Sequence, residues 1–377
     1  MKVLISCGGT GGHIYPGIAV ADELKRRHPD WQFLFVGCTY ELSLENKIVP
    51  EAGYDLVDID ADNYESYSTF MDDVKSTINI TKSVFQSMGI IRRFKPSVVI
   101  GTGGFVCAPV VLSAHLMGYP SMILEQNVIP GRTNKLLSYM ADRICISFEE
   151  SRQYMKKQDA CVITGNPLRG EFDDWDRISA RKELGLTRDE KMVLIFGGSL
   201  GAQSLNDAVV RMIDKVGRDK SNRIFFITGG ENYEQVRKEL ASLGIDEKRF
   251  PNVTVSDYRN DMPVLMNAAD LIVSRSGATT ISEINHVGVA TIYVPLKHAP
   301  NDHQRLNALA NVEKGAAIMC EDEEDLSERL TESVSKLLAD DGVRLEMANA
   351  SLALGISDSC SRICDIAEEL IAAGKKK

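Results

Sequence analysis

Three times along this chain, a short run of aliphatic residues leads into a glycine-rich turn and then into a helical pattern. The three runs with their turns are Val3–Ile5 before Gly8–Gly12, Val98–Ile100 before Gly101–Gly104, and Val193–Phe196 before Gly197–Gly201. Continuous runs of this kind that end in glycine are typical of parallel strands buried on both faces. Further strands are expected at 31–36, 121–125, 143–147, 161–164, 223–228, 253–255, 271–274, 291–294 and 317–319. Because helical stretches separate most of them, the pattern predicts an α/β protein with two doubly wound parallel sheets.

The length of the chain and one break in its pattern predict two domains in tandem. At 377 residues the chain has the size of two ordinary domains. The step Asn166-Pro167 interrupts regular structure, and the run from Val193 then restarts the pattern seen at the N-terminus. We expect Rossmann-like domains at 1–165 and 166–377. A last helical stretch spans about 323–373, and its final helix is a candidate to pack back on the first domain.

Charge and composition exclude several classes of protein. The net charge of −10 argues against nucleic acid as a partner, since phosphate backbones bind clustered lysine and arginine. No signal-peptide pattern and no apolar run of about 18 residues is present, so we expect neither a leader nor a spanning helix. The eight cysteines form no C-x-x-C pair, which predicts reduced thiols in a cytoplasmic protein and no metal site.

The glycine turns are candidates for binding phosphate groups. Backbone N–H groups at a helix N-terminus attract anions, and glycine lets a ligand approach the backbone closely. A single turn of this type can serve only to pack a helix on a strand, whereas one in each domain, facing a common cleft, favours a ligand. The turns lack Gly-Lys-Ser and Gly-Lys-Thr, which disfavours a P-loop NTPase. Ile14 stands where the third glycine of a dinucleotide fingerprint belongs, which disfavours a nicotinamide dehydrogenase.

The segment 8–17, GGTGGHIYPG, resembles the N-terminal signature of the MurG family of N-acetylglucosaminyltransferases of peptidoglycan synthesis. Six further blocks follow in the family order, at 101–105, 125–135, 165–169, 197–202, 274–283 and 302–308. The resemblance implies the GT-B fold, with two Rossmann-like domains and an active site in the cleft between them. It also implies UDP-N-acetylglucosamine (UDP-GlcNAc) as donor, a lipid-linked acceptor, inversion at the anomeric carbon, and no cofactor or metal.

The resemblance places acceptor binding in residues 1–165 and UDP-sugar binding in residues 166–377. Gly103 and Gly104 fall on the acceptor side. Glu283 is expected to accept the ribose hydroxyls, although a glutamate near a helix start is also favoured by the helix dipole. Ser199 is expected to face the diphosphate, although it also suits a helix N-cap. The implied donor-site residues are Thr10, Gly11, Gly12, Asn127, Arg169, Ser199, Arg259, Ala278, Thr279, Glu283 and Gln304.

His13 is the first candidate for the catalytic base, because imidazole titrates near neutrality and an inverting transfer must remove a proton from the acceptor hydroxyl. A histidine at a helix start can instead donate a hydrogen bond to phosphate or backbone. Glu125 is the competing base, and a buried structural carboxylate is the alternative interpretation of it.

Some residues depart from the family pattern and leave the acceptor open. Leu124 and Leu200 replace polar residues common in relatives, and an acidic stretch at 60–73 replaces a basic one. The alternatives are a GT-B transferase with another acceptor, a UDP-GlcNAc 2-epimerase, and a nucleotide-binding protein without catalysis. Ile80–Lys95 combines apolar helical spacing with basic residues, which suits either core packing or peripheral contact with a membrane. The expected location is the inner face of the cell membrane.

Overall fold

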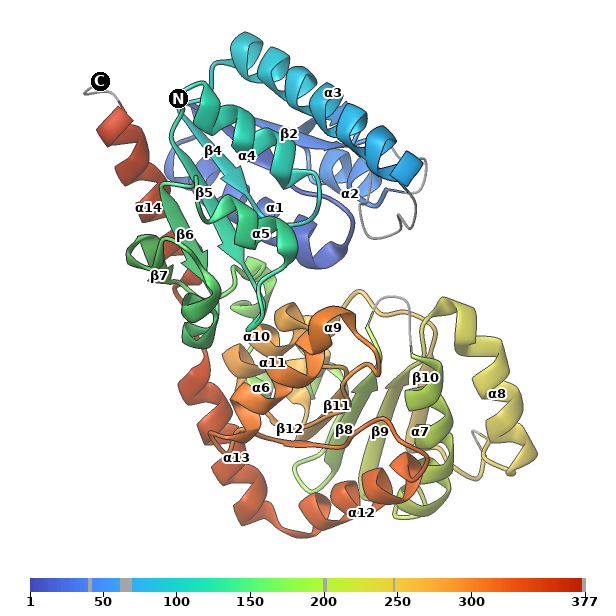
Figure 1. The fold of residues 1–377 in the computed structure, drawn as a ribbon. Helices are drawn as coiled ribbons and strands as arrows, with labels where there is room; N and C mark the ends of the chain where they lie inside the picture. Colours follow the sequence, from blue (N-terminus) through green and yellow to red (C-terminus); the bar gives the residue numbers. More distant parts are fainter. Residues whose placement is uncertain (40–42, 62–69, 199–201, 247, 375–377) are drawn as a thin grey trace. The chain divides into compact units, whose positions relative to one another are not determined.

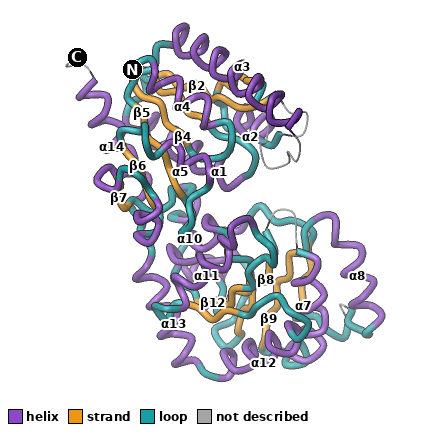
Figure 2. Tube along the Cα trace, in the orientation of Figure 1, coloured by secondary structure: helices purple, strands orange, loops and turns teal. Residues whose placement is uncertain are grey.

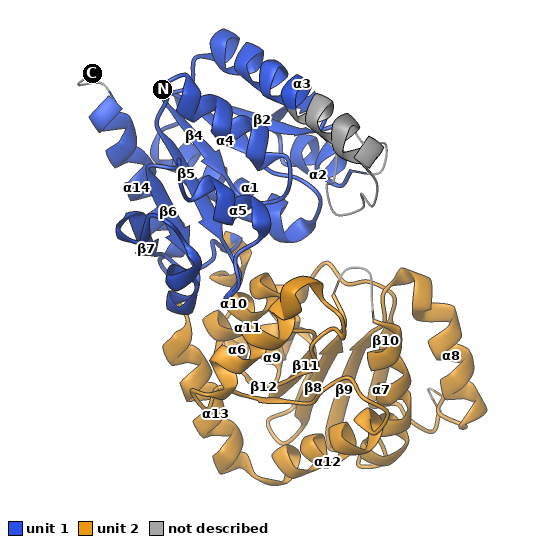
Figure 3. Ribbon diagram, viewed as in Figure 1, with its two compact units in different colours: residues 1–169, 358–377 blue, residues 170–357 orange. Residues whose placement is uncertain are grey.

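The chain is described by a computed structural model that covers residues 1–39, 43–61, 70–198, 202–246 and 248–374, with the side chains of the helix beginning at Phe70 described from residue 81 on. It divides into two compact units (Figure 3). Unit 1 comprises Met1–Arg169 and Asp358–Lys377, and unit 2 comprises Gly170–Ser357. In each unit, strands alternate with helices (Figure 1; Figure 2).

The core of unit 1 is a seven-stranded parallel sheet in the order β3-β2-β1-β4-β5-β6-β7. The strands are β1 (Lys2–Ser6), β2 (Gln32–Cys38), β3 (Asp55–Ile59), β4 (Val98–Gly101), β5 (Ser121–Glu125), β6 (Arg143–Ile146) and β7 (Cys161–Ile163). All strands predicted for this part of the sequence are present. β3 was not predicted, because it lies at an edge of the sheet and its exposed and buried residues mix, without a continuous apolar run.

Helices cover both faces of this sheet. They are α1 (Gly11–Arg27), α2 (Glu45–Glu51), α3 (Phe70–Phe94), α4 (Cys107–Leu116), α5 (Arg132–Leu137) and α14 (Ser359–Gly374). One buried cluster joins the sheet to α1 and α14, and a second joins it to α3, α4 and α5. The helix predicted to begin near Gly17 begins at Gly11, so the last two glycines of the turn belong to the first turn of α1.

Unit 2 repeats the architecture with a six-stranded parallel sheet in the order β10-β9-β8-β11-β12-β13. The strands are β8 (Lys191–Phe196), β9 (Asn222–Ile227), β10 (Val253–Ser256), β11 (Leu271–Ser274), β12 (Ala290–Tyr293) and β13 (Ala317–Met319). The helices are α6 (Arg177–Glu183), α7 (Gln203–Val216), α8 (Tyr233–Ser242), α9 (Met262–Ala268), α10 (Ala278–Val287), α11 (His303–Val312), α12 (Leu326–Ala339) and α13 (Asp341–Leu354). α7, α8 and α12 cover one face of this sheet, and their apolar residues form the main buried cluster of unit 2 together with the strands.

Both sheets have the strand order of a doubly wound fold, in which the later strands are added on the opposite side of the first strand from the earlier ones. The change of side lies between β1 and β4 in unit 1 and between β8 and β11 in unit 2. Ligands of such folds bind at the carboxyl ends of the strands at this position. The glycine turns at 8–12 and 101–104 follow β1 and β4, so the sequence motifs lie where the topology favours a ligand.

The C-terminal stretch predicted as helical consists of three helices. The side chain of Asp340 caps α13 by accepting a hydrogen bond from the amide of Val343 at 3.1 Å, and Gly355 ends α13. α14 then packs against α1 through a buried apolar face that includes Ile363 and Ala367, and it therefore belongs to unit 1. The division between the units falls after Arg169, whereas the sequence pattern placed it after residue 165.

Candidate active site

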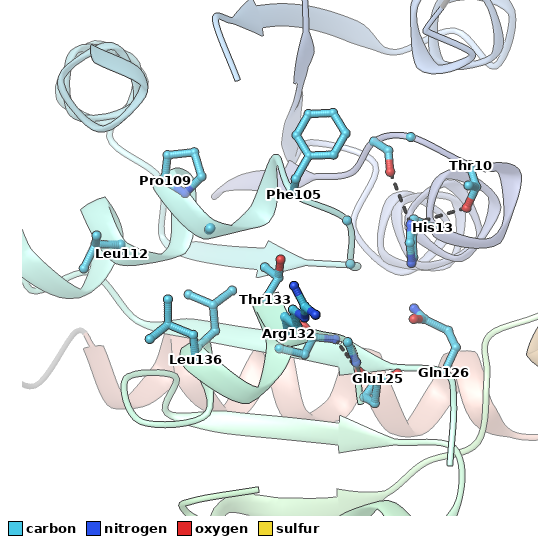
Figure 4. A pocket seen from close by; sticks show the side chains of 18 of the residues that line it. Thr10, His13, Phe105, Pro109, Leu112, Glu125, Gln126, Arg132, Thr133 and Leu136 are labelled. Carbon is cyan, nitrogen blue, oxygen red and sulfur yellow. Dashed lines mark hydrogen bonds between the residues drawn. The ribbon is translucent and has the colours of Figure 1, made fainter. Parts of the chain in front are cut away.

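A cavity of about 520 Å³ opens in unit 1 at the carboxyl ends of β1, β4 and β5. The turn at 8–10, the turn at 103–105 and the segment 125–134 form its polar part. The predicted residues Thr10, His13, Gly103, Gly104, Glu125 and Asn127 all line this one cavity (Figure 4). Gly11 and Gly12 lie in the first turn of α1 beside it. The fold therefore gathers residues that lie more than a hundred positions apart in the sequence.

The imidazole of His13 lies at the junction of the two glycine turns. Its Nδ1 is 3.2 Å from the carbonyl oxygen of Gly8 and 3.4 Å from Oγ1 of Thr10. A carbonyl oxygen can only accept a hydrogen bond, so Nδ1 carries the proton in this geometry and the lone pair of the neutral ring is on Nε2. In Figure 4 the ring edge opposite these two contacts faces into the cavity. The arrangement suits a proton acceptor.

The second glycine turn packs tightly around this histidine. Gly103 has a φ of +114° and Gly104 a φ of +82°, a backbone region that favours glycine. A methyl carbon on Gly103 would lie 2.5 Å from Cδ2 of His13, and one on Gly104 would lie 2.4 Å from the carbonyl oxygen of Gly8. Both positions therefore require glycine for a reason beyond the backbone angle.

Glu125 is 2% exposed, and both of its carboxyl oxygens accept hydrogen bonds. Oε1 accepts from the backbone amide of Asn127 at 2.9 Å and from its side chain at 3.3 Å. Oε2 accepts from the amide of Gly131 at 3.2 Å and from the side chain of Asn134 at 2.8 Å. Burial raises the pKa of the Glu125 carboxyl, and these hydrogen bonds act in the opposite direction. With its acceptor sites occupied, this group is built to hold the segment 126–134 in place.

The cavity also has an apolar wall that the sequence did not indicate as functional. It is formed by α4, α5, the residues next to their ends and one residue of α3, and comprises Val84, Phe105, Ala108, Pro109, Leu112, Leu136, Leu137 and Met140. In the sequence these residues read as helix core. Leu136 is nevertheless 53% exposed, which core packing alone does not explain.

In unit 2, the predicted nucleotide-sugar block forms the N-terminus of α10. Gly277 is the residue before the helix, Ala278 is buried in its first turn, and Thr279 follows. Glu283 is half-buried farther along the same helix. The first-turn N–H groups and the helix dipole make this end suited to an anion.

The loop before α10 is tied to α11 through Ser276. Its hydroxyl donates to the carbonyl oxygen of Gln304 at 2.8 Å, and its own carbonyl accepts from the side chain of Asn307 at 3.4 Å. The side-chain oxygen of Gln304 accepts from the amide of Leu296 at 3.0 Å. The structure thus brings Gln304 next to the block that contains Ala278.

The same loop contributes Arg275 to a buried ion pair. Arg275 is 7% exposed, and its guanidinium donates to Ser204 at 2.9 Å and pairs with Asp322 at 3.0 Å. Ser204 in turn donates to Asp322 at 2.7 Å. Burial lowers the pKa of Arg275, and the charge of Asp322 opposes that shift. The network joins the first turn of α7 to the loops after β11 and β13.

Three predicted donor-site residues remain: Arg169, Arg259 and Ser199. The guanidinium of Arg169 lies 5.2 Å from the ring centroid of Tyr15, a cation–π contact in unit 1. The side chain of Arg259 forms an ion pair with Asp261, so it stabilises its own loop. Ser199 lies outside the residues that the structure describes.

Comparison with known proteins identifies related chains. The family model of the glycosyltransferase family 28 N-terminal domain matches residues 3–146, and that of the family 28 C-terminal domain matches residues 192–363. The UDP-N-acetylglucosamine–N-acetylmuramyl-(pentapeptide) pyrophosphoryl-undecaprenol N-acetylglucosamine transferase of Bacillus cytotoxicus is 38% identical over 371 residues, which cover 98% of this chain and 100% of the relative. The crystal structure of MurG from Acinetobacter baumannii matches with a TM-score of 0.78 and 26% identity, over 98% of this chain and 99% of that one.

A UDP-GlcNAc 2-epimerase from Neisseria meningitidis shares the fold, with a TM-score of 0.67 at 16% identity over 97% of this chain and 99% of that one. The two matched domains and the two doubly wound sheets define a glycosyltransferase of family 28 with the GT-B fold. Within that class, the identity along nearly the whole chain shows that it belongs to the MurG family. Among the described residues, no helix is both long enough and apolar enough to span a bilayer.

Proposed function

We propose that this chain transfers N-acetylglucosamine from UDP-GlcNAc to the lipid-linked acceptor undecaprenyl-diphospho-N-acetylmuramoyl-pentapeptide (lipid I) and so forms lipid II. The observation that carries the proposal is the cavity of unit 1, in which two glycine turns surround the imidazole of His13 and the Gly8 carbonyl oxygen, by accepting from Nδ1, places the lone pair of the neutral ring on Nε2. The 38% identity to the Bacillus cytotoxicus transferase supports the same reaction.

The chemistry assigned to His13 is a single proton transfer. The C4 hydroxyl oxygen of the acceptor forms a bond to C1 of the donor sugar, and the bond from C1 to the diphosphate oxygen breaks. The hydroxyl proton passes to Nε2 of His13, and UDP leaves with the electron pair. General-base assistance of this kind contributes roughly 10²–10⁴-fold in rate. Glu125 has its acceptor sites occupied, so we assign it the positioning of Asn127 and its neighbours.

On the donor side, unit 2 supplies groups that stabilise the departing UDP. The N-terminus of α10 at Ala278 and Thr279 offers backbone N–H groups and a helix dipole to negative charge. Glu283 is assigned to the ribose hydroxyls, and Gln304 to the donor sugar or its phosphate. Thr10, Gly11, Gly12, Asn127 and Arg169 are assigned to the same donor from unit 1. The role of Arg259 is through its backbone, because Asp261 holds its side chain.

We further assign the surface of α3 and α5 to contact with the inner face of the cell membrane. Phe85 is 69% exposed, and Leu136 is half-exposed on the apolar wall of the cavity. Arg92, Arg93 and Lys95 are exposed at the end of α3, where they suit anionic headgroups. An apolar wall that continues to this surface also suits the hydrocarbon chain of a lipid acceptor.

Transfer of radiolabelled sugar from UDP-GlcNAc decides the function. Labelled lipid II is expected with lipid I as acceptor, and no conversion of the donor is expected without an acceptor. Transfer to a different acceptor with none to lipid I would refute the acceptor assignment, and conversion of the donor alone would indicate an epimerase. Flotation with vesicles that contain anionic lipid tests whether the surface of α3 and α5 binds a membrane. Phe85→Ser is expected to weaken vesicle binding without changing the fold.

A further inference from the structure

A buried carboxyl group lies directly behind the first glycine turn, and nothing in the proposed reaction uses it. Glu45 is the first residue of α2 and is fully buried. Its Oε2 accepts a hydrogen bond from the amide of Gly9 at 3.3 Å, and its Oε1 accepts from the thiol of Cys38 at 3.1 Å. Burying a carboxyl group is costly unless hydrogen bonds compensate it, so its place beneath the turn needs an explanation.

The peptide group between Gly8 and Gly9 connects this carboxyl group to the candidate base. In a trans peptide the N–H and the C=O point in opposite directions. The N–H of this peptide, on Gly9, donates to Glu45, and its C=O, on Gly8, lies 3.2 Å from Nδ1 of His13. Glu45, the peptide plane and the imidazole therefore form one line of hydrogen bonds.

The orientation of that peptide decides which nitrogen of His13 carries the proton. With its C=O toward the ring, it requires a hydrogen on Nδ1. With the peptide reversed, its N–H would point at Nδ1, and the hydrogen would have to reside on Nε2. Glycine on both sides of the peptide makes such a rotation easier than it is between residues with side chains, and Gly9 already has a φ of +88°. Without a fixed acceptor for the amide, the turn alone does not determine the tautomer.

We propose that Glu45 is a positioning residue that fixes the Gly8–Gly9 peptide and thereby keeps the proton of neutral His13 on Nδ1. The packing supports this assignment, because a methyl carbon on Gly8 would lie 3.0 Å from Oε1 of Glu45. The consequence for turnover rests on the proposed function of His13 as the base. The tautomer itself is independent of that function.

Nuclear magnetic resonance of the full chain tests the proposal, with one sample labelled with ¹⁵N-histidine for the tautomer and a second labelled with ¹⁵N-glycine for the Gly9 amide. Long-range ¹H–¹⁵N correlation distinguishes the two neutral tautomers, and the His13 signals are those lost in His13→Gln among the six histidines. The unchanged protein is expected to show the Nδ1–H tautomer at a pH where the ring is neutral, and a slowly exchanging Gly9 amide. The Nε2–H tautomer or a rapidly exchanging Gly9 amide in the unchanged protein would overturn the proposal, and His13→Gln serves only to assign the His13 signals.

Two substitutions extend the test. Glu45→Met keeps the length of the side chain and removes the acceptor, so it is expected to populate the Nε2–H tautomer and to lower kcat by roughly 10- to 100-fold, within the contribution of general-base catalysis. Glu45→Gln keeps one accepting oxygen and is expected to restore the Nδ1–H tautomer and most of kcat. Folded Glu45→Met with the original tautomer and kcat would overturn the proposal.

A matched control separates positioning from stability. Asp270 is also a largely buried carboxylate that accepts from a backbone amide, that of Met192 at 2.7 Å, but it lies in unit 2. Asp270→Asn is expected to lower stability and to leave the His13 tautomer unchanged. If Glu45→Met changes the tautomer but His13→Gln retains full turnover, the positioning role stands and the base assignment fails.

Discussion

Substituting alanine for each of two adjacent glycines, Gly103 and Gly104, is predicted to affect different properties of the protein. Gly103 faces the movable imidazole of His13, and Gly104 faces the backbone carbonyl of Gly8. An imidazole can rotate away from a new methyl group, whereas a carbonyl in a packed turn can move only with its backbone. Gly103→Ala should therefore chiefly reduce activity, and Gly104→Ala should chiefly reduce stability.

The magnitudes follow from the contacts. Both substitutions place a side chain at positive φ, which costs about 1–2 kcal/mol. In Gly104→Ala the methyl carbon would lie 2.4 Å from the Gly8 carbonyl oxygen, and such overpacking adds about 1–3 kcal/mol. In Gly103→Ala the displaced ring of His13 adds only about 0.5–1.5 kcal/mol for an unfavourable rotamer. Loss of a positioned base, however, lowers turnover by roughly 10²–10⁴-fold.

Urea unfolding and sugar-transfer kinetics measure the two effects separately. Gly118→Ala is the matched control, because Gly118 has a φ of +74° and a methyl carbon added there would have no atom of a more distant residue within 4 Å. It should show the cost of positive φ alone, with normal turnover. The reasoning would be refuted if Gly103→Ala kept normal turnover, or if Gly104→Ala were no less stable than Gly118→Ala.

Three further predictions concern single groups. The Arg26 hydrogen bond lowers the pKa of Glu23 to about 2. The ionised Glu23 therefore contributes fully to the unfolding free energy above the ordinary carboxyl pKa, and this contribution is lost as the pH falls toward 2. The unfolding free energy of Glu23→Gln should depend less on pH in that range. Burial raises the pKa of Cys107 to about 11, and only Cys360 among the cysteines is not buried, so iodoacetamide at pH 8 should label Cys360 first and the others only after denaturation. Glu125→Ala removes the acceptor shared by the amides of Asn127 and Gly131 and the side chain of Asn134, and should lower the unfolding free energy by about 1–3 kcal/mol in urea titrations. Unchanged stability would contradict its positioning role.

The strands could be predicted from the sequence wherever burial on both faces produced a continuous apolar run. The runs at Val98 and Leu271 are fully buried strands in the centres of their sheets. The pattern failed at β3, where one edge of the sheet leaves residues such as Asp55 exposed. It also failed to separate α12 from α13, because the break depends on the capping side chain of Asp340, which a helical pattern does not reveal.

The candidate site was predictable where chemistry is local and not where it depends on tertiary contact. The glycine turns and His13 form a short motif, and the structure brings them to one cavity. The apolar wall at Leu112 and Leu136 was missed, since apolar residues on a helix read as core. Glu45 was missed because its role depends on a contact with Gly9, 36 positions earlier, that only the fold creates.

The turnover of His13→Gln with UDP-GlcNAc and lipid I at saturating concentrations tests the role of the histidine most directly. Glutamine keeps the approximate size of the side chain and removes the basic nitrogen. A base at this position predicts a fall in kcat of at least roughly 100-fold, with the affinity for UDP-GlcNAc unchanged. A kcat equal to that of the unchanged protein would show that the proton of the acceptor hydroxyl leaves by another route.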